Sequence, residues 1–313
     1  MHLLPHRATI LLPLLLAVGG CAGAPPAAVP QGRNQVPALT VPAAVSATAA
    51  PSSEPVCGRR RVAGSVVLEL PGGRRALLAV PAGDDGHHRL PLVIGLHGYG
   101  RTSEDLAAQS RIPARATAAG MLAVLPQAAG SDKSWNLSDT TTGNDDVVFL
   151  SALVTQLAAT ECADPNRVVI TGISDGGDMA VFAACALPGR FRAVVTVAAT
   201  IDPRAGCHRI RIVAVHGDAD PVDPYLGKPG SGGYRATPPA AAAISAWAIL
   251  NGCRTPATTR VAQHISVITY PCGAQLVTVR GGGHTWPGGG SVNPSLGVTT
   301  KEYDATATIL ALV

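Results

Sequence analysis

Aromatic and charged residues are both scarce in this chain of 313 residues. Aromatics make up 4% of it, and Asp, Glu, Lys and Arg together make up 14%, against about 25% charged residues in a typical soluble protein. The net charge is only +4, and no basic stripe alternates with aromatics, so nucleic-acid binding is not expected. No Cys-x-x-Cys pair or His/Cys cluster has the spacing of a zinc site, which argues against a metal centre.

One apolar run near the N-terminus has the length of a signal peptide. It covers residues 8–18, follows the basic Arg7 and is too short for a comfortable membrane span. The sequence Val18-Gly19-Gly20-Cys21 comes next and resembles the bacterial lipobox, in which the cysteine is lipidated and becomes the new N-terminus. We therefore expect a signal peptide at residues 1–20, a lipid anchor on Cys21 that attaches the protein to the membrane, and an extracellular or cell-surface location. Ordinary secretion with cleavage after Ala24 is the alternative.

The next segment has neither helical nor alternating periodicity. Residues 21–55 are rich in Ala, Pro, Val, Ser and Thr and carry almost no charge, which is typical of a flexible, partly extended tether. We expect this linker to hold one folded domain, residues 56–313, away from the membrane.

Seven cysteines are present, and setting Cys21 aside leaves six. An even number in an exported chain predicts disulfides. Cys253 and Cys272 flank a strand-like stretch and are the best pair. Cys185 with Cys207 is second, and Cys57 with Cys162 follows by elimination.

Buried strands and helices alternate along most of the chain. Strands are predicted at residues 66–70, 75–80, 92–96, 121–125, 168–170, 193–198, 210–215, 264–270 and 275–279, and helices at 103–119, 145–160, 239–251 and 301–312. This alternation predicts an α/β fold with a mostly parallel sheet covered by helices on both faces. In such sheets ligands bind at the carboxyl ends of the strands.

Gly172-Ile173-Ser174-Asp175-Gly176 lies between a predicted strand and a predicted helix. This is the strand–turn–helix setting of a G-x-S-x-G nucleophile elbow, in which a strained turn lifts the serine hydroxyl above the sheet edge. The pattern predicts that Ser174 is a catalytic nucleophile in an α/β-hydrolase fold. The alternative is an ordinary glycine-rich turn.

A serine nucleophile needs a base and an acid that orients the base. In α/β-hydrolases these follow in the order Ser, Asp or Glu, His, and His284 is the last histidine, placed after three glycines. Asp220 is the preferred acid in the loop that follows the strand at 210–215, over Asp218 and Asp223, which we expect to bond nearby backbone amides. Asp202 is a more distant candidate.

An oxyanion hole needs two backbone N–H groups. The residue after the nucleophile, Asp175, should supply one of them. Tyr99, in Leu96-His97-Gly98-Tyr99-Gly100 at the end of a buried strand, should supply the other.

Four blocks together resemble the family of polyhydroxybutyrate depolymerases and feruloyl esterases. These are residues 97–100, 172–179, 216–225 and 283–288, and the resemblance covers most of residues 60–313. It places the acid on Asp220 and implies a secreted serine esterase that acts on short hydroxyalkanoate oligomers or hydroxycinnamoyl esters, without a cofactor. Asp145 and Asp146 match another family block, which we interpret as a helix start that supports the site.

Three aromatic residues are candidates for the substrate pocket, and each could equally be a packing residue: Trp135, Tyr225 and Trp286. Asp175 replaces the asparagine that is usual in the family. Its negative charge should favour the His284 imidazolium, which predicts an activity optimum at higher pH than in an Asp175→Asn variant.

Two other functions fit the same residues. An acyltransferase would differ only in the second nucleophile, an alcohol in place of water. A non-catalytic surface lipoprotein could use the fold to bind a ligand, although the three intact catalytic candidates argue against it.

Overall fold

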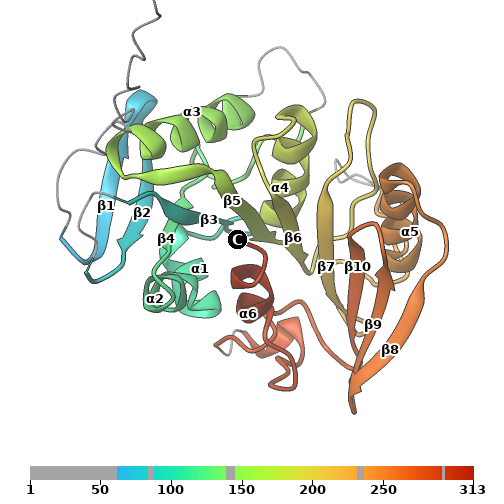
Figure 1. Ribbon diagram of the computed structural model, residues 1–313. Helices are drawn as coiled ribbons and strands as arrows, with labels where there is room; N and C mark the ends of the chain where they lie inside the picture. Colours follow the sequence, from blue (N-terminus) through green and yellow to red (C-terminus); the bar gives the residue numbers. More distant parts are fainter. Residues whose placement is uncertain (1–61, 84–87, 139–144, 231–235, 291–292) are drawn as a thin grey trace, which may run out of the picture. The chain divides into compact units, whose positions relative to one another are not determined.

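A ten-stranded mixed sheet forms the centre of the described part of the chain (Figure 1). The computed structural model describes residues 62–83, 88–138, 145–230, 236–290 and 293–313. The strand order is β1-β2-β4-β3-β5-β6-β7-β10-β9-β8. The strands are β1 (Gly64–Leu70), β2 (Arg74–Val80), β3 (Leu90–Leu96), β4 (Leu122–Pro126), β5 (Ala163–Ile173), β6 (Ala193–Val197), β7 (Arg211–Gly217), β8 (Ala257–Ala262), β9 (Ile265–Tyr270) and β10 (Ala274–Val279).

The six strands from β4 to β10 in this order are parallel to one another, and the strands at each end of the sheet are antiparallel. Because parallel strands share one carboxyl edge, the residues that follow β3, β5, β7 and β10 lie at that same edge. The predicted α/β-hydrolase fold class is confirmed.

Helices cover both faces of the sheet. They are α1 (Ser103–Ser110), α2 (Ile112–Ala118), α3 (Asp145–Thr160), α4 (Asp175–Ala186), α5 (Ala240–Asn251) and α6 (Ala305–Leu310), with short 3-10 turns η1 (Pro71–Gly73) and η2 (Pro294–Leu296). One apolar core joins α3, α4 and α5 to one face, and a second joins α1, α2 and α6 to the other (Figure 1). Neighbouring strand residues alternate between them, Leu92 and Ile94 in the first core and Val93 in the second, as the period of two along a strand requires.

Two elements differ from the sequence prediction. The helix predicted at 103–119 is two helices, because Arg111 has a left-handed φ of 58° and ends α1, and Pro113 occupies the first turn of α2, where proline is favoured. Strand β8 was not predicted. It lies at the sheet edge and is almost entirely exposed, so it lacks the apolar alternation by which strands are recognised.

Two of the three predicted disulfides, Cys185–Cys207 and Cys253–Cys272, are present. The signal peptide, Cys21, the linker and Cys57 lie outside the described residues, so these predictions, and the pairing of Cys57 with Cys162, stay predictions. Within the ranges that the structure describes, no helix has the length and apolarity needed to cross a bilayer. Disulfides form in oxidising compartments, so the two bonds indicate an extracellular protein.

Candidate active site

Ser174 sits in a strained turn between β5 and α4. Its φ is 56° and its ψ is −129°, a conformation that is rare for a residue with a side chain and recurs at functional sites. The turn is tight enough to require its glycines, since a Cβ on Gly172 would lie 2.2 Å from the Gly176 oxygen. A Cβ on Gly176 would lie 2.3 Å from the Leu96 oxygen, so the elbow also packs directly on the end of β3. The elbow predicted from the sequence is present.

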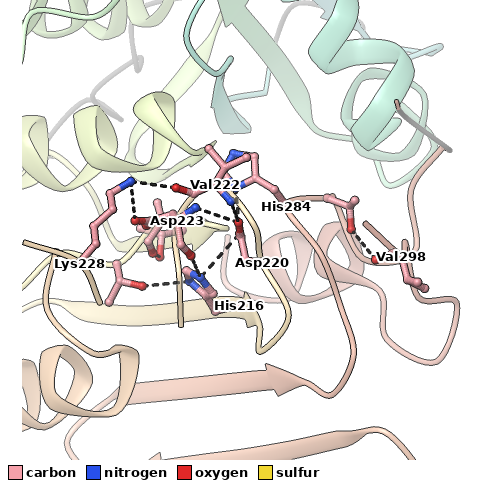
Figure 2. Close-up of polar contacts among 11 residues, drawn as sticks. His216, Asp220, Val222, Asp223, Lys228, His284 and Val298 are labelled. Carbon is pink, nitrogen blue, oxygen red and sulfur yellow. Dashed lines mark hydrogen bonds and ion pairs between the residues drawn. The ribbon is translucent and has the colours of Figure 1, made fainter. Parts of the chain in front are cut away.

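His284 and Asp220 form a buried pair. The His284 Nδ1 lies 2.8 Å from Asp220 Oδ2, and because a carboxylate can only accept, Nδ1 is the donor. The same carboxylate accepts hydrogen bonds through Oδ1 from the backbone N–H groups of Val222 and Asp223, both at 2.8 Å (Figure 2). Burial alone would raise the pKa of the Asp220 carboxyl, but these hydrogen bonds and the His284 imidazole outweigh it and hold the pKa below its usual range. Asp220 is therefore ionised at neutral pH and fixed in position.

A second buried histidine supports the loop that carries Asp220. The His216 Nε2 lies 2.8 Å from the carbonyl oxygen of Asp223, to which it donates, and Nδ1 lies 2.9 Å from the Thr200 hydroxyl. The same Nε2 is 3.7 Å from Asp220 Oδ2 (Figure 2). Lys228 holds the other side of the loop by donating to the Val222 carbonyl at 2.8 Å.

The two rejected aspartates have other partners. Asp218 Oδ1 accepts a hydrogen bond from the backbone N–H of Gly281 at 2.6 Å, which links the acid loop to the glycines before His284. Asp223 Oδ1 faces Lys228 at 3.5 Å instead of a backbone amide. Neither carboxylate has a hydrogen bond to His284 among the described residues, so of the three aspartates in this loop Asp220 is the one bonded to His284.

Ser174 and His284 line one cavity of about 430 Å³. No hydrogen bond joins their side chains among the described residues. Catalytic hydrogen bonds are often long in free enzymes and shorten when substrate binds, so the shared cavity is the relevant observation. Tyr99 lines this cavity too, with 58% of its surface exposed.

The loop after β3 lies against the nucleophile. A Cβ on Gly98 would lie 3.4 Å from the Ser174 Cβ, which brings the backbone of Gly98 and Tyr99 next to the serine. Asp175 begins α4, where N–H groups have no intrahelical acceptor. The structure thus brings the two predicted oxyanion donors to the two sides of Ser174.

Trp135 connects these two sides from the interior. Its indole Nε1 donates to the His97 carbonyl at 2.8 Å, and its backbone N–H donates to Asp175 Oδ2 at 2.9 Å. His97 is neutral, because burial lowers its pKa, and its Nε2 accepts from the Ala128 N–H at 3.0 Å. Its proton is therefore on Nδ1, which donates to the Gly98 carbonyl at 2.8 Å.

The three aromatic candidates for substrate binding do not line the cavity. Trp135 is 3% exposed and Trp286 is 0% exposed. Each indole N–H has an acceptor in the interior: the His97 carbonyl for Trp135 and the Thr306 hydroxyl for Trp286. The Tyr225 hydroxyl lies 2.8 Å from that of Thr278, and its ring packs edge-on against His216. The first two are packing residues here, which is the alternative that the sequence analysis left open for each of them.

The cavity walls also include residues that the sequence analysis did not propose as substrate contacts. Besides the candidates already named, the lining comprises His97, Gly98, Arg101, Asp105, Leu106, Ala108, Gln109, Ile173, Val222, Asn293 and Leu296. Arg101 lies four residues after His97 in the same loop. This position next to the predicted oxyanion loop was the only feature of the sequence that could have indicated that Arg101 lines the cavity. Asp146 was expected to support the site. Its carboxylate accepts a hydrogen bond at 2.7 Å from the N–H of Asn136, the residue directly after Trp135, and pairs with Arg74 at 2.5 Å.

Comparison with known proteins shows the family to which this chain belongs. The model of the prolyl oligopeptidase family matches residues 109–210. A protein of Nocardia uniformis subsp. tsuyamanensis described as "Putative esterase NocK" is 31% identical over 91% of this chain and 90% of its own length. Feruloyl esterase C of Emericella nidulans is 29% identical over 56% of this chain and 65% of its own length.

A solved structure shares the fold. The acetyl xylan esterase from Aspergillus awamori superposes with a TM-score of 0.56 and 17% identity, over 71% of this chain and 94% of its own. The Nocardia relative is similar over nearly the whole of both chains, and the described residues carry the elbow of a serine hydrolase. The chain therefore belongs to the esterase family of α/β-hydrolases represented by these proteins, and it is a serine ester hydrolase.

Proposed function

We propose that this protein is a secreted esterase that uses Ser174, His284 and Asp220 as a catalytic triad. The observation that carries the proposal is the alignment of three strand ends at one sheet edge, with Asp220 bonded to His284 Nδ1 and His284 sharing a cavity with Ser174. This arrangement leaves Nε2 of the imidazole available to the serine hydroxyl.

The proposed reaction has two steps. Ser174 Oγ attacks the ester carbonyl while His284 Nε2 accepts its proton, and the N–H groups of Tyr99 and Asp175 stabilise the oxyanion. His284 then gives the proton to the departing alcohol, which leaves an acyl-enzyme. A water molecule then attacks the acyl-enzyme carbonyl while His284 takes its proton. His284 returns that proton to Ser174 Oγ as the ester bond to the serine breaks, which releases the acid. Asp220 keeps the imidazole in its Nδ1–H tautomer throughout.

The proposed substrates are short hydroxyalkanoate oligomers or hydroxycinnamoyl esters. The similarity to feruloyl esterase C supports the second class, and the sequence blocks described above support both. The cavity of about 430 Å³ is within the usual size range of small-molecule sites, which suits a single ester or a short oligomer.

A panel of p-nitrophenyl, hydroxybutyrate and ferulate esters tests this function, with wild type compared to Ser174→Ala. The variant keeps the Cβ and the backbone bond from Ser174 N–H to the Val197 carbonyl, so the fold is retained. We expect kcat to fall by roughly 10⁴-fold or more. Equal turnover in the two proteins would refute the proposal.

We also propose that a lipid on Cys21 anchors the enzyme to the membrane. A Cys21→Ala variant should move from the membrane fraction to the medium with its esterase activity retained. The corresponding measurement is the incorporation of labelled palmitate, which we expect in wild type and not in the variant. If wild type incorporates no palmitate, the protein is secreted without a lipid anchor.

A further inference from the structure

The active-site cavity combines apolar walls with a single cationic side chain that is independent of the proposed triad. Its apolar lining comprises Leu106, Ala108, Ile173, Val222 and Leu296. Gln109 and Asn293 add neutral polar groups, and Arg101 and Asp105 are the lining residues with ordinary charged side chains. Whether the cavity favours an anionic or a cationic ligand therefore depends on which of these two charges, that of Arg101 or that of Asp105, is already compensated by the protein.

The backbone of Arg101 is held in place on three sides. Its N–H donates to the Gly98 carbonyl at 3.1 Å, and its carbonyl accepts from Gln127 Nε2 at 3.2 Å. The neighbouring Gly100 turns the chain with a φ of 67° and donates to the Lys133 carbonyl at 3.2 Å. The arginine is therefore anchored in the loop that also carries the proposed oxyanion donor Tyr99.

The guanidinium of Arg101 has no hydrogen bond or ion pair with any of the described residues, and the residue is exposed. Asp105 does not neutralise it. The Asp105 carboxylate accepts from the Thr102 N–H at 3.0 Å through Oδ2 and completes the capping box of α1. Since a carboxylate at a helix N-terminus is already compensated by the helix dipole, the charge of Arg101 is available to a ligand in the cavity.

We propose that Arg101 is a subsite for a carboxylate carried by the substrate. A guanidinium can bind a carboxylate through two parallel hydrogen bonds, while the apolar walls contact the aliphatic part of the ester. The inference rests on the function proposed above and narrows it to hydroxyacid oligomers. Every such oligomer has a free carboxylate at one end, whereas the carboxyl group of a hydroxycinnamic acid is consumed in its ester bond.

The test compares two dimers of 3-hydroxybutyrate that differ only in their free end. One is the acid, and the other is the terminal primary amide, which has the same shape and no charge. The quantity measured is the ratio of kcat/KM for the acid to kcat/KM for the amide. We expect Arg101→Gln to lower this ratio by roughly tenfold, the usual effect of losing a charge-assisted hydrogen bond. The ratio for Arg101→Lys should lie between those of wild type and Arg101→Gln, because lysine keeps the positive charge but lacks the planar guanidinium that forms two parallel hydrogen bonds.

Arg192→Gln is the matched control. Arg192 is exposed and directly precedes β6, at the sheet edge opposite the site, so this variant makes the same change in net charge and should leave the ratio unaltered. Added salt should lower the wild-type ratio and leave that of Arg101→Gln nearly constant. An equal ratio in wild type and Arg101→Gln would overturn the subsite while leaving the esterase function intact. Activity that survives in Ser174→Ala would instead overturn the proposed function.

Discussion

At the scale of single residues, the two halves of the proposed oxyanion hole depend on one tryptophan. Trp135 bonds the carbonyl of His97 on one side and the carboxylate of Asp175 on the other, while the ring itself is buried. A buried ring cannot bind substrate, so its contribution to catalysis must come through the backbone that it positions.

Trp135→Phe keeps one aromatic ring, removes the indole N–H and leaves a small void, which the control variant below also leaves. We expect kcat to fall by roughly tenfold with a smaller change in KM, because the oxyanion donors lose their alignment. Trp247→Phe is the control, since the Trp247 N–H also donates to a buried carbonyl, that of Ile201 at 2.8 Å, but from α5. Both variants should lose about 1–2 kcal/mol of stability, measured by urea unfolding. A purely structural role would give equal kcat values in the two variants.

Asp175→Asn tests the half-buried carboxylate beside the nucleophile. Burial raises the pKa of Asp175, against the opposing hydrogen bonds from Trp135 and Ser134. A carboxyl whose pKa is higher in the folded state destabilises the fold progressively as pH rises from the unfolded pKa to the folded one. The variant should therefore gain free energy of unfolding relative to wild type between pH 4 and pH 7.

The same variant tests the predicted effect on activity. Removing the negative charge beside the site should shift the acid limb and the optimum of the pH–rate profile to lower pH. Superimposable pH–rate profiles of wild type and variant would show that the charge of Asp175 does not affect the ionisation of His284. A stability difference that is constant between pH 4 and pH 7 would show that Asp175 is not perturbed by burial.

At the scale of elements, the loop that carries His284 is attached to two helices on one face of the sheet. The Trp286 indole N–H donates to the Thr306 hydroxyl in α6 at 3.0 Å, and that hydroxyl donates to the carbonyl of Ser110, the last residue of α1, at 2.7 Å. These two hydrogen bonds connect the loop that carries His284 to α6 and α1, which belong to the second core. The position of the His284 imidazole therefore depends on how α6 packs.

Thr306→Val should break this connection with almost no change in shape. It leaves the buried indole N–H and the Ser110 carbonyl without their partner, which should lower the free energy of unfolding by about 2 kcal/mol or more. We expect kcat to fall as well, because His284 loses its support. Thr306→Ser keeps the hydroxyl and should restore kcat; a Ser variant as slow as the Val variant would contradict the role of the bond.

The elements that could be predicted from sequence are those with strong local signals. Buried parallel strands such as β3 and β4 are continuous apolar runs, and the elbow at Ser174 has its own five-residue pattern. The break at Arg111 had only a weak signal, the proline at position 113, because the left-handed conformation falls on a residue that is not glycine. Three aspartates compete in the loop after β7. The sequence favoured Asp220, the family resemblance placed the acid on the same residue, and the hydrogen bond to His284 agrees with that choice.

At the scale of the whole molecule, stability and catalysis are concentrated at opposite edges of the sheet. Ser174, Asp220 and His284 follow the carboxyl ends of β5, β7 and β10. Cys272 lies instead just before β10, whose first residue pairs with Ile212 near the start of β7. Cys185 is 11 residues along α4 from Ser174, which is about 16 Å at 1.5 Å per residue. Both disulfides are thus remote from the chemistry.

This separation predicts that a disulfide can be removed without loss of turnover. The Cys253–Cys272 bond spans 19 residues, so the double variant Cys253→Ser, Cys272→Ser should lose about 3 kcal/mol of unfolding free energy. Its kcat at 25 °C should match that of wild type, because the bond links the segment just after α5 to the turn before β10 and neither cysteine lines the cavity. Urea unfolding and initial rates on one p-nitrophenyl ester measure the two quantities on the same preparation. A fall in kcat without a fall in stability would mean that the two edges of the sheet are coupled, and that the positions of His284 and Asp220 depend on the amino ends of β7 and β10.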